Sequence, residues 1–188
     1  MQTKALRNLY LKTVQFDIIN KFPIKNTKNI CKINKTVLNF GCKTYEIKKL
    51  STALLALELM TNQKAQLTTT NRPNIELKIR KGDPIGCKVT LRNNRALDFT
   101  YETMINIFSQ LKNFEEISLS SRSVMSQNSL TYMINDTFAF KELENNYQLF
   151  QYLPSLKITV VTNINEKDQF LFVLKSFKTP FTVKNLQI

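Results

Sequence analysis

The chain has 188 residues, a length that suits a single domain with one hydrophobic core. Lysine and arginine number 27 against 14 acidic residues, a formal net charge of +13, which indicates a polyanionic partner rather than merely a basic surface. A hydrophobic fraction of 43% excludes a disordered basic tail, and no apolar run approaches the roughly twenty residues that span a bilayer, so no membrane partner is expected.

The first predicted elements are a helix, a strand and a second helix. Apolar residues at helical spacing predict an amphipathic helix over 4–21, which ends before Pro23. A β-prone stretch over 30–40, closed by Gly41, predicts a strand. Apolar residues then recur at helical spacing over 45–60, which predicts the second helix.

A β-hairpin is predicted next, after a polar loop over 68–74. Apolar and charged residues alternate over 75–80 as in a strand, residues 82–84 predict a turn, and 85–91 predict the returning strand. The outer face of this hairpin would hold four cations in one compact patch: Lys78, Arg80, Lys88 and Arg92.

The second half of the chain continues the mixed pattern. Periodicity predicts four further elements: a helix over 97–111, a β-prone stretch over 130–140, a strand over 156–164 and a helix over 166–177. The serine-rich segment 118–129 is the one long loop predicted. The expected architecture is a single α+β domain over residues 1–188.

Catalytic chemistry has little support in this composition. The chain lacks histidine, the commonest general base and metal ligand, so we expect neither an enzyme nor a bound metal or cofactor. The three cysteines are widely spaced, and Cys87 lies within an apolar strand, where packing explains it better than nucleophilic chemistry. The remaining candidate is a basic strand surface, for which the alternative is a solvated sheet edge protected by charge.

The residues Lys78-Ile79-Arg80-Lys81-Gly82-Asp83-Pro84-Ile85-Gly86-Cys87-Lys88-Val89-Thr90-Leu91-Arg92 closely resemble the signature of large-subunit ribosomal protein five. Weaker matches follow the same order at 32–41, 156–160 and 179–181. The resemblance covers about residues 6–181 and leaves a short tail at 182–188. It implies a four-stranded antiparallel sheet with helices packed on one face, in a structural, non-catalytic protein that binds 5S ribosomal RNA at the central protuberance.

The resemblance also implies which residues contact RNA. Carried over by motif position, the residues expected to contact 5S ribosomal RNA are Lys35, Asn39, Gln63, Thr90 and Arg92. Lys78, Arg80 and Lys88 join them in the predicted RNA-binding set because they belong to the basic patch. Large-subunit ribosomal RNA is the expected partner instead if this ribosome lacks 5S ribosomal RNA.

Two loops are expected to make further contacts. The family's contact with the transfer RNA in the peptidyl site falls on a loop whose expected contact residues are Thr70, Asn71, Arg72 and Asn74. Pro73 and Glu76 depart from the family's basic, glycine-containing tip. The segment 118–129 corresponds to the loop that approaches a protein of the small-subunit head, and other large-subunit proteins are expected as neighbours.

The composition also bears on location. The bias towards Asn, Lys, Ile and Phe is typical of an AT-rich genome, and the match begins at about Leu6, which leaves no room for a presequence. We therefore expect a mitochondrial ribosome and a gene in the organelle, before a plastid or a bacterial cytoplasm. The alternative function is a stand-alone organellar protein that binds or processes RNA, which would require exposed stacking aromatics or a catalytic site.

Overall fold

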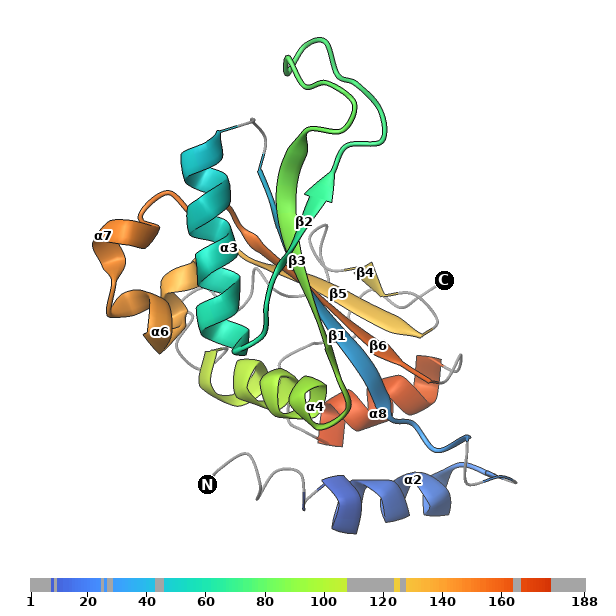
Figure 1. Ribbon diagram of the computed structural model, residues 1–188. Helices are drawn as coiled ribbons and strands as arrows, with labels where there is room; N and C mark the ends of the chain where they lie inside the picture. The colour runs from blue at the N-terminus through green and yellow to red at the C-terminus, as the bar shows by residue number, and fades with distance from the viewer. Residues whose placement is uncertain are drawn as a thin grey trace. The chain divides into compact units, whose positions relative to one another are not determined.

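The structure is a computed structural model that describes residues 8, 10–24, 26, 29–42, 46–107, 124–125, 128–163 and 167–176 (Figure 1). The chain forms two compact units. Unit 1 comprises residues 1–36, 91–132 and 159–188, and unit 2 comprises residues 37–90 and 133–158. The single ribosomal-protein domain expected over 1–188 stays a prediction.

The strands form one sheet in the order β2-β3-β1-β6-β5-β4. Its four longer strands are β1 (Ile33–Gly41), β3 (Pro84–Arg92), β5 (Ser129–Ile134) and β6 (Leu156–Thr162), and the division between the units falls inside each of them. The edge strands β2 (Gln66–Thr69) and β4 (Val124–Met125) are short. The α+β class with an antiparallel sheet is confirmed, but the count of four strands is wrong, because two such short edge strands have no recognisable alternation.

Burial alternates along the longer strands, as the period of two requires. In β3, Cys87, Val89 and Leu91 are buried, whereas Lys88 and Arg92 are exposed. The other three strands bury one face in the same way, through these residues: Leu38, Phe40, Leu130, Tyr132, Ile134, Leu156, Ile158 and Val160. The opposite face of each strand is left open for polar side chains.

In unit 2, the helices α3 (Ile47–Thr61), α6 (Lys141–Glu144) and α7 (Tyr147–Phe150) lie together on one side of the strands (Figure 1). The helix predicted over 45–60 is confirmed as α3. Its buried side contains Ala53, Ala56 and Leu57, whose spacing matches one face of a helix. The β-prone stretch predicted over 130–140 is β5 followed by a 3₁₀ turn, η5 (Thr137–Ala139), and then by the unpredicted α6 and α7.

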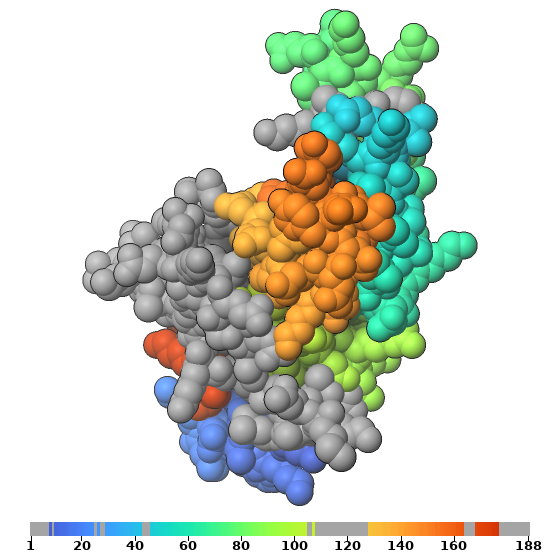
Figure 2. Space-filling view, turned by 90° about the vertical axis from the view of Figure 1, so that its left-hand side faces the viewer, coloured from blue at the N-terminus to red at the C-terminus, as the bar shows by residue number. Residues whose placement is uncertain are grey.

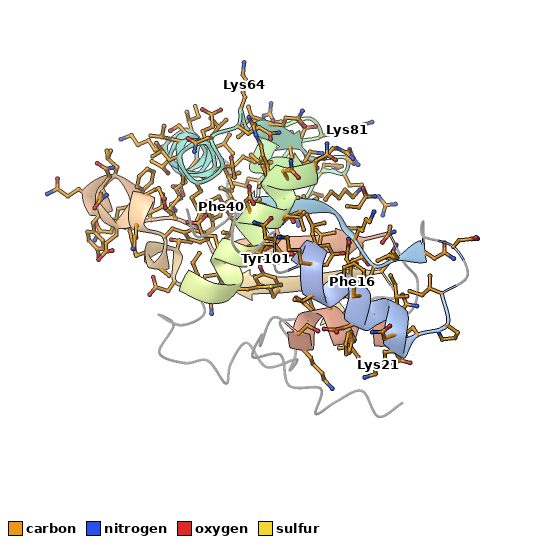
Figure 3. All side chains as sticks on the ribbon, turned by 90° about the horizontal axis from the view of Figure 1, so that it is seen from below. Phe16, Lys21, Phe40, Lys64, Lys81 and Tyr101 are labelled. Atoms are coloured by element: carbon orange, nitrogen blue, oxygen red, sulfur yellow. The ribbon has the colours of Figure 1, made fainter. Side chains whose placement is uncertain are left out.

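In unit 1, the helical segments are η1 (Tyr10–Val14), α2 (Gln15–Lys21), α4 (Asn93–Glu102), η3 (Thr103–Ile107) and α8 (Lys167–Ser176). They confirm the helices predicted over 4–21, 97–111 and 166–177 wherever these lie in the described residues. Helix α2 packs against α8, where Lys21 (labelled in Figure 3) places its Nζ atom 4.5 Å from the ring centroid of Phe172. This contact combines apolar packing with a cation–π interaction.

Asn163 ends the strand predicted over 156–164 and joins it to the segment before β1. Its Nδ2 atom donates to the carbonyl oxygen of Ile30 at 3.0 Å, and its Oδ1 atom accepts from the amide of Lys32 at 2.8 Å. The side chain therefore replaces backbone pairing just beyond Thr162, within unit 1.

The predicted hairpin is wrong in its first strand. The partner of β3 is β2, with Gln66 opposite Lys88 and Leu67 opposite Cys87, and residues 75–78 form a turn instead of a strand. The residues Thr70–Asp83, called the finger below, connect β2 to β3 and project beyond the ends of these strands (Figure 1). The compact patch expected from Lys78, Arg80, Lys88 and Arg92 on one strand surface therefore does not form.

Several predictions fall on other parts of the chain. The loop predicted over 118–129 is wrong at 124–125, which are β4, and at Ser129, which begins β5; residues 118–123 and 126–127 lie outside the described residues. The tail at 182–188 also lies outside them. Within the described residues, no helix is long and apolar enough to cross a membrane.

Candidate RNA-binding surface

The open face of β3 carries the polar half of the motif found in the sequence. Because side chains alternate along a strand, Lys88, Thr90 and Arg92 point away from the side that buries Val89 and Leu91. Lys88 and Arg92 are exposed and Thr90 is half-buried. Two cations therefore flank a hydroxyl group along one strand, which suits contacts with phosphate and ribose oxygens.

The open face of β1, the neighbour of β3 in the sheet, is also polar. Lys35 and Asn39 are half-buried and alternate with the buried residues Thr36, Leu38 and Phe40. An amide and an amine on this face add a further donor and acceptor to those of β3. Both positions agree with the strand predicted over 30–40.

Gln63 contacts the backbone of β3 at Thr90. Its Nε2 atom donates to the carbonyl oxygen of Thr90 at 3.2 Å, across 27 positions of sequence. Gln63 and Thr90, both predicted to contact RNA, are thus brought together in unit 2. No sequence pattern indicated this contact, since it depends on where α3 ends relative to β3.

The base of the finger is closed by several hydrogen bonds. The amide of Thr70 donates to the carbonyl oxygen of Asp83 and the amide of Gly82 donates to that of Thr70, both at 3.0 Å. The hydroxyl of Thr70 donates to the carbonyl oxygen of Arg80 at 2.6 Å. The hydroxyl of Thr70, predicted to contact transfer RNA, is thus bonded within the protein.

The tip of the finger is a tight turn. The backbones of Asn74 and Ile79 pair in both directions at 2.9 Å, and Lys78 adopts a left-handed conformation with φ of 52°. Ile79 is buried, whereas Ile75 is 93% exposed, so the alternation seen over 75–80 does not produce two faces of a strand. Asn71, Arg72, Asn74, Lys78 and Arg80 are all exposed.

The finger also carries acidic groups. It holds four cations and two carboxylates, and the carboxylate of Asp83 accepts a hydrogen bond from the amide of Arg80 at 2.8 Å. Glu76 lies exposed in the tip itself, between Ile75 and Leu77. Its charge repels phosphates, so cations on either side of the tip must supply any attraction to RNA.

The cysteines have the environment of core residues. Burial raises the pKa of the Cys87 thiol to about 12, with a smaller contribution from nearby Cys42, and burial also raises the pKa of Cys31 to about 12. Such thiols stay protonated at neutral pH and are poor nucleophiles. No group of three or more acidic, cysteine or histidine side chains that could hold a metal ion occurs in the described residues.

A second surface in unit 2 was not predicted. Helices α6 and α7 lie beside α3 and present exposed acidic and apolar side chains together (Figure 2). This α6–α7 surface consists of Glu142, Glu144, Tyr147, Leu149 and Tyr152, of which Tyr152 is 72% exposed. Residues 133–156 contain three carboxylates and one lysine, so this segment is acidic within a strongly basic chain.

The chain is similar to known ribosomal proteins along nearly its whole length. Residues 84–181 match the family described as the C-terminus of the ribosomal protein L5 family. The large ribosomal subunit protein uL5m of Reclinomonas americana is 31% identical over 177 residues, which cover 93% of this chain and 96% of that protein.

Two relatives named large ribosomal subunit protein uL5 match to a similar extent. That of Blochmanniella floridana is 31% identical and that of Wigglesworthia glossinidia brevipalpis is 30% identical. These matches cover 93% and 94% of this chain and 91% and 98% of the two relatives. The family match and the three relatives agree, and the chain belongs to the uL5 family of ribosomal proteins, which are structural proteins and not enzymes.

Proposed function

We propose that this protein is a structural constituent of the large ribosomal subunit, at its central protuberance, and that the open faces of β3 and β1 bind ribosomal RNA. The observation that carries the proposal is the alternation in β3, which directs Lys88, Thr90 and Arg92 to the face opposite the buried Val89 and Leu91. The net charge of +13 supports an anionic partner, and the mixture of amine, guanidinium, amide and hydroxyl groups suits structured RNA.

The proposed RNA is 5S ribosomal RNA, or large-subunit RNA in a ribosome that lacks it. The proposed contacts on the two open faces are Lys35, Asn39, Lys88, Thr90 and Arg92, with Gln63 beside Thr90. These side chains come from two regular strands, which hold polar groups in place more firmly than a loop does. No aromatic residue occurs on the open face of β3, which disfavours a stand-alone binder that stacks bases on its sheet.

A crosslinking experiment tests this role directly. Ribosomes are isolated at several salt concentrations from cells that express the tagged protein, and RNA crosslinked to it is sequenced. We expect crosslinks from β3 to 5S ribosomal RNA, or to large-subunit RNA alone if the 5S species is missing. A protein that never sediments with ribosomes would contradict the ribosomal role and favour the stand-alone alternative.

We propose that the finger contacts the transfer RNA in the peptidyl site through Asn71, Arg72, Asn74 and the cations Lys78 and Arg80. Its support is a projecting shape, closed at the base by hydrogen bonds, and an excess of two positive charges. Thr70 would contribute by closing the finger. Loss of crosslinks to transfer RNA in an Arg72→Ala ribosome, with β3 crosslinks retained, is the expected result.

The α6–α7 surface favours a protein neighbour over RNA. Exposed carboxylates such as Glu142 and Glu144 repel phosphates, whereas exposed tyrosine and leucine side chains are typical of protein interfaces. We infer that basic ribosomal proteins, from the large subunit or the small-subunit head, are its partners. Protein crosslinks from Lys141 in isolated ribosomes would support this assignment, and RNA crosslinks there would contradict it.

We propose a mitochondrial ribosome as the location. One relative carries the mitochondrial name uL5m, and the Asn-, Lys- and Ile-rich composition agrees with an organellar gene. The two relatives named uL5 match almost equally well, so fractionation must decide. Recovery of the protein with mitochondrial ribosomes is the expected outcome, and recovery with plastid or cytoplasmic ribosomes would contradict it.

A further inference from the structure

Gln63 occupies a place where the edge of β3 has lost its strand partner. The pairing of β2 with β3 begins with Gln66 opposite Lys88, so β2 does not reach Thr90. There the Nε2 atom of Gln63 donates to the carbonyl oxygen of Thr90 at 3.2 Å. A side-chain amide thus takes over the hydrogen bonding that a longer β2 would have provided.

The segment that carries Gln63 is itself held in place. Asn62 adopts a left-handed conformation with φ of 49° and ends α3 by donating its amide hydrogen to the carbonyl oxygen of Glu58 at 2.9 Å. The hydroxyl of Thr61 lies 3.4 Å from the carbonyl oxygen of Gln63. On the other side of Gln63, the amide of Ala65 donates to the carboxylate of Glu58 at 3.0 Å.

These bonds leave little freedom to the Gln63 backbone. Its neighbours on both sides are tied to the last turn of α3, and its side chain is half-buried against β3. Lys64 differs, because its side chain points away from the protein into solvent (Figure 3). The Gln63 amide nitrogen is therefore engaged with β3 before any RNA arrives.

We propose that Gln63 is a positioning residue that acts on RNA through Thr90. It would hold the backbone of β3 so that the Thr90 hydroxyl has a fixed position on the open face. Preorganisation of this kind strengthens binding because less freedom is lost when the complex forms. The inference rests on the proposed function and refines it: Gln63 supports the surface, and Thr90 contacts the RNA.

A double-mutant cycle separates positioning from direct contact. Gln63→Met keeps the length of the side chain but removes its amide, and Thr90→Val keeps the shape of the other residue but removes its hydroxyl. Affinity for a transcript of the Blochmanniella floridana 5S ribosomal RNA is measured for both single variants and the double variant. The exposed Gln66 of β2 provides the matched control, Gln66→Met.

We expect Gln63→Met to weaken binding by about three- to tenfold in the wild-type background, the effect of one hydrogen bond, and to have little effect in the Thr90→Val background. Gln66→Met should leave affinity unchanged. In the RNA-free protein, Gln63→Met should also accelerate amide hydrogen exchange at residues 89–91.

Two results would overturn the inference. Additive losses in the cycle would mean that Gln63 contacts RNA independently of Thr90, and unchanged affinity of Gln63→Met would mean that it does neither. A wild-type protein that binds neither this transcript nor large-subunit RNA would overturn the proposed function itself. The wild-type measurement therefore distinguishes the two failures.

Discussion

Gly86 and Phe40 approach each other so closely that a Cβ atom on Gly86 would lie 2.7 Å from the carbonyl oxygen of Phe40. The hydroxyl oxygen of Thr68 lies at the same distance on the β2 side. Gly86 thus lies where β3 is packed between both of its neighbours. A backbone atom of β1 cannot move aside as the end of a flexible side chain can.

Gly86→Ala should therefore destabilise the protein by about 1–3 kcal/mol, the usual range for overpacking a core position. The measurement is the free energy of unfolding in urea. Gly41→Ala is the matched control, because a Cβ atom there meets nothing within 4 Å and Gly41 has no positive φ. Equal stability of the two variants would contradict the close approach at Gly86.

The two kinds of RNA contact proposed for β3 should respond differently to salt. Lys88→Ala should weaken RNA binding and reduce the slope of log affinity against log salt by about 0.7–0.9, the effect of one lost phosphate contact. Thr90→Val should weaken binding by a similar factor but leave the slope unchanged, because a hydroxyl releases no counterion.

Filter binding over a salt series measures both effects on one RNA. Lys48→Ala is a suitable control, because Lys48 is exposed on α3, away from the open strand faces. If Lys48→Ala reduces the slope as much as Lys88→Ala does, binding is a general consequence of net charge. The proposed surface would then lose its support.

The longer elements could be predicted because their periodicity reflects burial directly. β1, β3, α3 and β6 each bury one face of a regular pattern, and the alternation in β3 was enough to place Lys88, Thr90 and Arg92 together. Elements of four residues, such as α6, lie below the length at which a period can be recognised.

The finger could not be predicted because its alternation has another cause. Over 75–80 the apolar residues suggested a strand, but only Ile79 is buried, and Asn74 and Lys78 form a turn that pairs the chain with itself. The strand that pairs with β3 is the polar segment Gln66–Thr69, which packing selects despite its weak pattern. The link between Gln63 and Thr90 depends on that choice and was equally hidden.

The buried thiols predict a pH dependence of stability. The pKa values of Cys31 and Cys87 are raised to about 12 by burial, from 9.0, so the folded protein favours the protonated thiols. The unfolded chain ionises first as the pH rises above about 9, so the stability they contribute is complete below that pH and declines towards 12.

Urea midpoints measured from pH 8 to 11 should fall, and Cys87→Ala should make the fall less steep even if it lowers stability at pH 8. In the native protein at pH 8, Cys31 and Cys87 should react with maleimide only after denaturant is added, because a protonated, buried thiol is unreactive. Rapid labelling of Cys87 in the native state would contradict its place in the core.

Lys78 connects the conformation of the finger to its proposed role. Its φ of 52° lies in the left-handed region, which disfavours a side chain and favours glycine. Lys78→Gly should therefore leave stability unchanged or raise it by up to about 1 kcal/mol, while Lys81→Gly, at a position without positive φ, should lower it.

The same Lys78→Gly variant removes a cation from an otherwise intact finger. Crosslinks from the finger to transfer RNA should decline although the protein is no less stable, which separates loss of a contact from loss of the fold. Urea unfolding and ribosome crosslinking measured on the same preparation test both statements. If Lys78→Gly and Lys81→Gly destabilise the protein equally, the left-handed turn at the tip is wrong; if crosslinking is unchanged, Lys78 does not contact the transfer RNA.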